Sequence, residues 1–171
     1  SKLSFSRFPF LSNLNLTESN LGCFNGKTWT GTEEGVYSVN PTSNEKIAYT
    51  SFTKLEEYEE TIKNMNELKD KWMNYPMVKR GDIVKEIGDL IKLKKHDLGR
   101  LIALEVGKIE REGVGEVQEV IDICDYAQGL SRTLPGKIYQ SERKEHILLE
   151  NWNPLGTIGV ITAFNFPFAV L

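Results

Sequence analysis

The sequence predicts an α/β fold, and three patterns along its 171 residues support that prediction. Residues 20–50 contain short β-like runs separated by turn residues. Apolar residues then recur at helical spacing over residues 53–133. An apolar, β-branched run at residues 158–162 follows, which is typical of a strand buried in a sheet.

Two turn clusters divide the first part of the chain into strands. Asn25-Gly26 is typical of a type I′ hairpin turn, in which both central residues adopt positive φ. A second cluster, residues 40–44, separates the β-like runs 36–39 and 45–50. We therefore expect two or three strands of a small antiparallel meander.

The first ten residues are mildly basic, lack acidic side chains and contain serines. This composition fits the remnant of a transit peptide. It fits an ordered N-terminal arm as well, and that is the interpretation we favour.

Capping signals predict the limits of the first two helices. Thr53 and Glu56 form a capping-box pattern, and the helix behind them is expected to end near Met73. Pro76 is expected to open the second helix, because a missing N–H costs nothing in the first turn. The apolar stripe expected to be buried on this second helix is Ile83, Val84, Ile87, Leu90 and Ile91.

Two further helices are predicted after the second. Asp97 is expected to cap the third helix, which ends at Gly107, and the fourth is expected to span residues 114–133. The side chains expected to be buried are Leu98, Leu101, Ile102 and Val106 on the third helix and Val117, Val120, Ile121, Cys124 and Leu130 on the fourth.

Composition and charge exclude several classes of partner. The net charge of -3 leaves no broad basic face, so we expect no nucleic-acid partner. No apolar run approaches the roughly 20 residues needed to cross a bilayer, so we expect no membrane partner. Cys23, Cys124, His96 and His146 are isolated and lack metal-ligand spacing. We expect reduced thiols, no metal site and a cytoplasmic location, with the mitochondrion as the alternative.

Asn165 places a polar amide directly after the predicted terminal strand, between apolar residues. A buried amide without a partner costs about 1–3 kcal/mol. An amide at the mouth of a strand is therefore expected to hold something that arrives later. The structural alternative is that Asn165 caps a following helix, whose first turn Pro167 would suit.

Several motifs then narrow the interpretation. They are Asn165-Phe-Pro167, Asn40-Pro41 with Glu45, Glu105-Val-Gly-Lys108, Gly113-Val-Gly-Glu-Val-Gln-Glu119, Trp152-Asn-Pro-Leu-Gly156 and Ile161-Thr-Ala-Phe164. Together they resemble the aldehyde dehydrogenase superfamily, and within it the antiquitin branch of α-aminoadipic semialdehyde dehydrogenases. The resemblance covers nearly the whole chain.

The resemblance implies that the chain is the N-terminal portion of the aldehyde dehydrogenase fold, roughly a third of a family chain. It implies a domain organisation in four parts: an N-terminal arm and β-meander at 1–50, helices of the NAD-binding domain at 51–135, part of the oligomerisation β-element at 136–155, and the first strand of the Rossmann-like NAD-binding core at 156–171.

The resemblance also assigns roles to residues near the end of the chain. In the family, an asparagine amide and a backbone N–H hold the oxyanion that forms when a cysteine thiolate attacks the aldehyde, and Asn165 matches that asparagine. Thr162, Ala163 and Phe164 match the strand end that contacts the adenosine half of NAD, the cofactor; the alternative is a packed strand end.

Three residues are matched to the substrate site by the same resemblance. Glu119 matches a glutamate that pairs with the ammonium group of the substrate; the alternative is an ordinary exposed glutamate of a helix. Phe166 and Ala169 match the lining of the aldehyde tunnel, although an aromatic at a strand end is usually part of a core.

The predicted function is NAD-dependent oxidation of an aldehyde, with α-aminoadipic semialdehyde of lysine catabolism as the expected substrate, in a homo-oligomeric oxidoreductase (tetramer or dimer). Neither Cys23 nor Cys124 is the expected nucleophile, which the family places in a later Gly-Gln-x-Cys context, as it places the general-base glutamate. We therefore expect no turnover from these 171 residues alone. The alternative is a catalytically inactive truncated product that acts as an interaction module.

Overall fold

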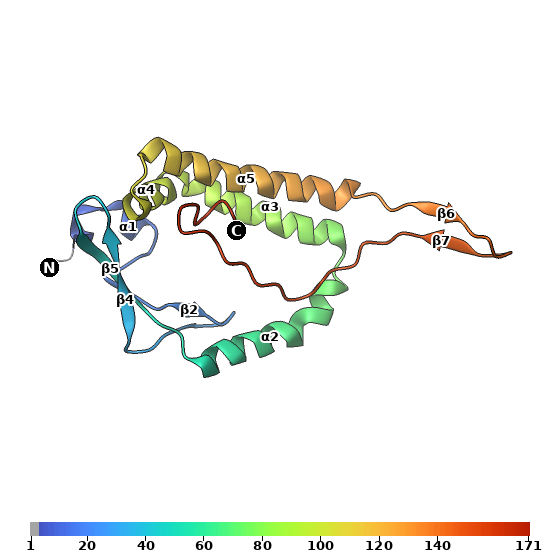
Figure 1. The fold of residues 1–171 in the computed structure, drawn as a ribbon, viewed down its shortest axis with the longest axis horizontal. Helices are drawn as coiled ribbons and strands as arrows, with labels where there is room; N and C mark the ends of the chain where they lie inside the picture. The colour runs from blue at the N-terminus through green and yellow to red at the C-terminus, as the bar shows by residue number, and fades with distance from the viewer. Residues whose placement is uncertain (1–3) are drawn as a thin grey trace.

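The computed structural model describes residues 4–171 and confirms an α/β chain (Figure 1). The first part contains η1 (Phe5–Arg7), α1 (Phe10–Asn13), β1 (Ser19–Asn20), β2 (Cys23–Phe24), β3 (Trp29–Thr30), β4 (Gly35–Asn40) and β5 (Glu45–Ser51). The second part contains α2 (Leu55–Met73), α3 (Met77–Leu93), α4 (Lys95–Val106), α5 (Glu110–Thr133), β6 (Ile138–Gln140) and β7 (Ile147–Leu149).

The main sheet has three strands in the order β1-β5-β4. β4 and β5 form the predicted antiparallel hairpin, with a register shift between Ser38 and Val39. The prediction of a simple meander is wrong for β1, which pairs parallel to β5. The chain between them passes through the β2–β3 hairpin and through β4, and this excursion brings β5 back in the same direction as β1.

The β2–β3 hairpin is confirmed at Asn25-Gly26, but its turn is not of type I′. Of the two residues Asn25 and Gly26, only Gly26 has a positive φ, of 91°. The Asn25 side-chain oxygen instead accepts hydrogen bonds from the backbone N–H groups of Lys27 and Thr28, both at 2.9 Å. An asparagine whose side chain caps a turn occupies the first position of that turn. The centre of this turn therefore lies one residue later than predicted.

The N-terminal arm is ordered from residue 4; residues 1–3 lie outside the described part of the chain. Ser4 and Leu11 are almost fully buried. The Ser4 N–H and hydroxyl both donate to the Lys46 carbonyl, at 2.8 and 3.0 Å, and Arg7 pairs with Glu45. These contacts tie the arm to β5 and support the arm interpretation for residues 4–13.

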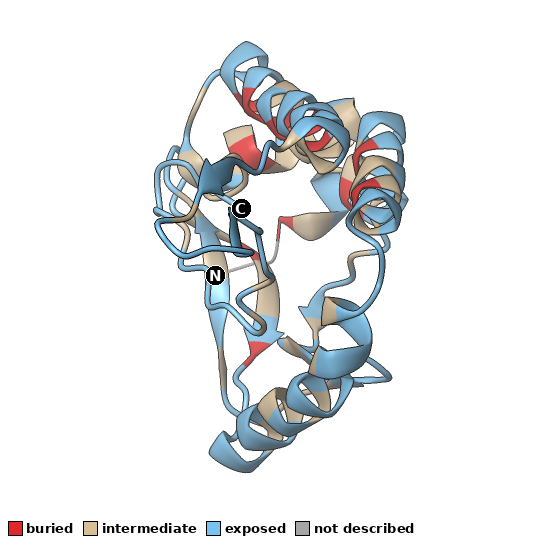
Figure 2. Cartoon of the chain, turned by 90° about the vertical axis from the view of Figure 1, so that its right-hand side faces the viewer, coloured by how far each residue is buried: buried red, intermediate tan, exposed pale blue. Residues whose placement is uncertain are grey.

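Three helices, α3, α4 and α5, pack into one layer that carries most of the buried residues (Figure 2). Its core is Ile102 of α4 with Val117 and Ile121 of α5. Glycines permit the close approach: a Cβ on Gly88 would lie 2.8 Å from the Cβ of Cys124. Residues of the apolar stripes predicted for α4 and α5 meet in this core.

The stripe predicted for α3 is only partly buried. α3 meets α5 through Gly81 and Gly88, which are both buried, whereas Ile83, Ile87 and Leu90 are exposed. The prediction of burial was wrong for these three residues. The face of α3 that contains Gly81 and Gly88 allows the closest approach to α5, so that face packs against α5 and the larger side chains point away from it.

The predicted helix limits are largely confirmed. α2 ends at Met73, Pro76 directly precedes α3, and Gly107 ends α4 with a φ of 81°. The predicted capping box of Thr53 and Glu56 is wrong: the N-cap is Lys54, whose N–H donates to Glu57 at 3.1 Å, and a lysine side chain cannot accept the return hydrogen bond.

The other two helices begin earlier than predicted. α4 starts at Lys95, with Asp97 inside its first turn, where the carboxylate accepts a hydrogen bond from Asn13 at 3.1 Å. α5 starts at Glu110 rather than at residue 114. Within residues 4–171, none of the helices is both long and apolar enough to cross a membrane.

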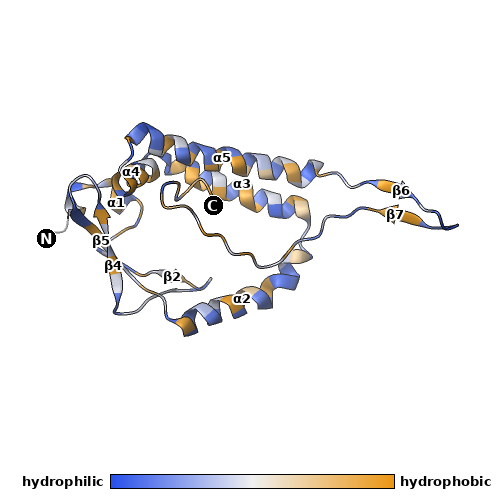
Figure 3. Ribbon diagram, viewed as in Figure 1, coloured by the Kyte–Doolittle hydropathy of each residue, from blue (hydrophilic) through white to orange (hydrophobic). Residues whose placement is uncertain are grey.

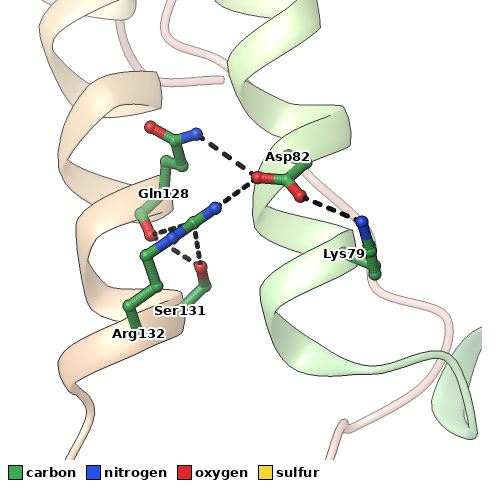
Figure 4. Close-up of polar contacts among 5 residues, drawn as sticks. All are labelled: Lys79, Asp82, Gln128, Ser131 and Arg132. Carbon is green, nitrogen blue, oxygen red and sulfur yellow. Dashed lines mark hydrogen bonds and ion pairs between the residues drawn. The ribbon is translucent and has the colours of Figure 1, made fainter.

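A polar network joins α3 to the last turns of α5 (Figure 4). Arg132 contacts Asp82 at 2.5 Å, Gln128 donates to the same carboxylate at 3.4 Å, and Lys79 lies 3.9 Å away. The Arg132 hydrogen bond lowers the pKa of Asp82 below its ordinary value. This group is exposed, so the network orients the two helices more than it stabilises them.

The predicted terminal strand, residues 158–162, is not a strand. The segment passes α2, where the Thr157 hydroxyl donates to Asn66 at 3.2 Å, and Ile161 is 96% exposed. Strands of a parallel sheet are stable when neighbours cover them, and no strand of the described residues 4–171 pairs with this segment. The prediction of a buried strand is wrong for this structure for that reason.

β6 and β7 form a hairpin that projects from the helical layer (Figure 1). The sequence indicated a strand from Ile147 but not its partner Ile138–Gln140, and all residues of both strands are exposed. Figure 3 shows hydrophobic residues in both strands. The role of this hairpin in oligomerisation stays a prediction.

Candidate active-site loop

The loop that carries Asn165 is a tight turn. Ala163 and Phe166 form an isolated antiparallel bridge, and the Phe166 N–H donates to the Ala163 carbonyl at 3.1 Å. Asn165 therefore lies at the tip of the turn, where it is exposed. Within residues 4–171 its side-chain amide has no hydrogen-bond partner.

The structural alternative for Asn165 was a helix cap. Residues 167–170 form turns rather than a helix, with the Leu171 N–H donating to the Phe168 carbonyl at 3.2 Å. The structure therefore contains no helix for Asn165 to cap among the described residues. The amide is left available to an incoming group.

A buried glutamate, Glu116, anchors the residues after Asn165. It lies on α5 and is 3% exposed. One of its carboxylate oxygens accepts the backbone N–H groups of Phe168 and Ala169, at 2.8 and 3.1 Å. Its other oxygen pairs with the Lys108 ammonium at 2.7 Å. The buried carboxylate is thus fully paired, as the cost of an unpaired buried charge requires.

Sequence reasoning missed Glu116, although the sequence contained a signal. Gly113, Glu116, Val117 and Val120 follow helical spacing, and the last two are apolar residues of the buried stripe. A carboxylate on the buried side of a helix needs a cation or several donors. Lys108, eight residues earlier, would have been the candidate.

Two aromatic side chains of the same loop also contact this part of the chain. The Phe166 ring lies over the Lys108 ammonium, with 3.9 Å from the nitrogen to the ring centroid. Phe168 packs against the core of Ile102, Val117 and Ile121. The loop is therefore fixed on α4 and α5 at residues 166–169, while Asn165 projects from it.

The pKa of Glu116 reflects opposing effects. Burial would raise the pKa, but the hydrogen bonds from Lys108 and from the N–H groups of Phe168 and Ala169 lower it below the ordinary value overall. The carboxylate is therefore ionised at neutral pH and keeps its pairing with Lys108.

We predict that Glu116 contributes to acid sensitivity in the full-length protein. Because its pKa is lowered on folding, its stabilising contribution is fully present above about pH 4.3, the ordinary glutamate value, and is lost as the pH falls through the lower folded value. The apparent Tm of the wild type should fall more steeply than that of Glu116→Gln below about pH 4.3. Parallel curves for the two proteins, followed by thermal unfolding, would contradict this.

The other predicted site residues are distributed as follows. Phe164 is 92% exposed and Ala163 is exposed, while Thr162 is half-buried. Ala169 is half-buried within the anchored loop. The structure brings Asn165 together with Phe166 and Ala169 in one loop.

Glu119 is placed apart from this loop. It is exposed on α5, and within residues 4–171 its side chain makes no hydrogen bond or ion pair. Glu119 lies three residues after Glu116, yet Glu116 contacts the loop and Glu119 faces solvent. Its role in substrate recognition stays a prediction.

The two cysteines differ in environment. Cys124 is buried, and burial raises the pKa of its thiol, so it is a poor nucleophile. Cys23 is half-buried, with its sulfur 3.9 Å from the Thr61 hydroxyl. In the described part of the chain, no group of three or more His, Cys, Asp or Glu side chains could hold a metal ion.

The sequence pattern of the aldehyde dehydrogenase family matches residues 29–171, and the chain belongs to this family. It is 51% identical to aldehyde dehydrogenase family 7 member A1 of Pisum sativum, over 95% of this chain and 32% of the relative. It is 49% identical to alpha-aminoadipic semialdehyde dehydrogenase of Rattus norvegicus, over 96% of this chain and 30% of the relative.

The fold is also similar to that of a solved dehydrogenase. The NADP-dependent glyceraldehyde-3-phosphate dehydrogenase of Bacillus halodurans, complexed with NADP, matches with a TM-score of 0.78 and 26% identity over 88% of this chain and 33% of that one. The chain spans about a third of the length of the curated relatives it matches. The resemblance inferred from the motifs is confirmed.

Proposed function

We propose that this chain forms part of an NAD-dependent enzyme that oxidises α-aminoadipic semialdehyde to the carboxylate. The observation that carries the proposal is the exposed amide of Asn165 at the tip of an anchored turn, in a chain that belongs to the aldehyde dehydrogenase family. The identity of nearly half to the rat alpha-aminoadipic semialdehyde dehydrogenase supports the choice of substrate.

The chemistry assigned to Asn165 is electrostatic. A nucleophile attacks the aldehyde carbonyl and places negative charge on its oxygen, and the side-chain N–H of Asn165 donates a hydrogen bond to that oxyanion. A neutral amide can do so without transferring a proton. The turn from Ala163 to Phe166 fixes the backbone that carries this amide.

The cofactor would lie against the segment that precedes Asn165. Residues 158–162 belong to no helix or strand of the described residues, so the main-chain groups of Thr162 and its neighbours have no strand partner and could contact a ligand. When bound there, NAD would accept the hydride that leaves the substrate carbon. The solved relative is complexed with NADP, which supports a nicotinamide dinucleotide as the cofactor.

Subunit contacts are proposed for the β6–β7 hairpin. Its side chains are exposed and largely apolar, and it projects from the rest of the chain (Figure 3). An exposed apolar hairpin is stabilised when another chain covers it. We propose a homo-oligomer on this basis, located in the cytoplasm or the mitochondrion.

The test of the proposed function is an assay of the full-length protein. We expect reduction of NAD that depends on α-aminoadipic semialdehyde, measured by absorbance of the reduced cofactor, with NADP compared in parallel. Reduction that is absent with every aldehyde tested, from a protein that is folded by circular dichroism, would contradict the proposal.

The substrate assignment has a separate test at Glu119. In the full-length enzyme, Glu119→Gln should raise KM for the amino-acid aldehyde by about 10-fold or more, because one charge-assisted hydrogen bond is lost. KM for a plain alkyl aldehyde should stay nearly unchanged. Glu112→Gln, at another exposed glutamate of α5, is the matched control. Equal changes for both aldehydes would remove Glu119 from substrate recognition.

A further inference from the structure

We propose that Glu116 is a positioning residue for Asn165: held by Lys108, it anchors the backbone after Asn165 and thereby sets where the Asn165 amide lies. The inference rests on the proposed function, because it concerns the same oxyanion-binding amide. It adds a residue on α5 that does not touch the reacting atoms.

The contact pattern is specific for an anchor. A single carboxylate oxygen receives two successive backbone N–H groups, from Phe168 and Ala169, three and four residues after Asn165. Two donors on one oxygen fix the orientation of that part of the backbone. Pro167 lies between them and Asn165, and its ring fixes φ at that position, which restricts how far the backbone of Asn165 can move relative to the anchor.

Lys108 is the second part of the anchor. Its ammonium lies 2.7 Å from the other oxygen of Glu116 and 3.9 Å from the centroid of the Phe166 ring. The side chain of Lys108 is 15% exposed and that of Glu116 only 1%, so water screens the pair weakly. The same cation therefore holds the carboxylate that binds residues 168–169 and the ring directly after Asn165.

Geometry alone leaves a structural explanation, in which Glu116 links α5 to the end of the chain without influence on chemistry. The two explanations differ in one respect. A positioning residue acts through Asn165, so its effect on kcat should vanish when Asn165 has been removed. A residue that is merely structural should lower kcat by the same factor in both backgrounds.

The decisive experiment is a double-mutant cycle in the full-length enzyme. Glu116→Ala should lower kcat by about 10²-fold when Asn165 is present, the size of effect expected from a displacement of about 1 Å. In the Asn165→Ala background, the same substitution should lower kcat by less than about twofold. Equal losses in both backgrounds would overturn the proposal.

Glu116→Gln gives a milder version of the same cycle if the alanine variant does not fold. A glutamine oxygen can still accept the N–H groups of Phe168 and Ala169, but it has no charge to pair with Lys108. We expect a smaller loss of kcat that again requires Asn165. Glu112→Ala, one turn earlier on α5 and exposed, is the control for a changed helix charge.

A second measurement tests the anchor without relying on activity. Amide hydrogen exchange of the full-length protein should be faster at residues 168 and 169 in Glu116→Gln and Glu116→Ala than in Glu112→Ala. Unchanged exchange at these amides would overturn the anchor even in an enzyme whose activity confirms the proposed function. Faster exchange in a protein that oxidises no aldehyde would instead contradict only the proposed function.

Discussion

Asn165→Ala is expected to lower kcat of the full-length enzyme by about 10²–10³-fold, because one donor to the oxyanion is lost. KM for the aldehyde should change little, since the amide interacts most strongly with charge that develops after binding. In the structure Asn165 is exposed at the tip of a turn, so removing its side chain leaves no cavity. The apparent Tm should therefore stay close to that of the wild type.

The measurement is a steady-state comparison at saturating cofactor, with thermal unfolding of each variant. Asn74→Ala is the matched control, because Asn74 is an exposed asparagine at the end of α2. If Asn165→Ala lowers kcat by less than about threefold, the loss is far smaller than that expected for a missing oxyanion donor. Such a result would exclude Asn165 as that donor. A large fall in Tm would instead indicate a structural role.

The second large effect is expected for stability at the crossing of α4 and α5. Gly113 is buried there, and a Cβ on it would clash with the backbone carbonyl of Gly99 and lie 3.3 Å from the Ala103 nitrogen. Backbone atoms of a helix cannot rotate away as a flexible side chain can. Gly113→Ala should therefore destabilise the protein by about 1–3 kcal/mol, in spite of the better helix propensity of alanine.

Gly115 provides the control two residues further along the same helix. A Cβ on Gly115 would meet nothing within 4 Å. Gly115→Ala should stabilise the protein by up to about 1 kcal/mol, because only the helix propensity changes. Thermal or denaturant unfolding of the two full-length variants should give shifts of opposite sign, and shifts of the same sign would contradict the packing described for α4 and α5.

Local features of the sequence predicted the helices well. Pro76 and Gly107 act through the backbone, Pro76 at the start of α3 and Gly107 at the end of α4, so neighbours in the sequence are sufficient to place these helix limits. The same holds for the Asn25-Gly26 hairpin. The motif around Asn165 was also recognised from adjacent residues alone.

Features that depend on distant partners were not predictable in this way. Residues 158–162 have the composition of a buried strand, but a strand exists only where another strand pairs with it. Ile83 and Ile87 lie on an apolar stripe, yet the glycines of α3 decided which face meets α5. In both cases the sequence contained the expected apolar pattern, but residues in other parts of the chain determined whether that pattern became buried.

The candidate site shows the same division between local pattern and tertiary contact. The sequence by itself determined the family of this protein, the order of its helices and the amide at Asn165, because these are properties of neighbouring residues. Only the tertiary structure decided that Glu116 is buried and paired with Lys108 and the loop, and that Glu119 is exposed. The physical reason is that the side chains of both glutamates have the same chemistry, and their surroundings alone distinguish them.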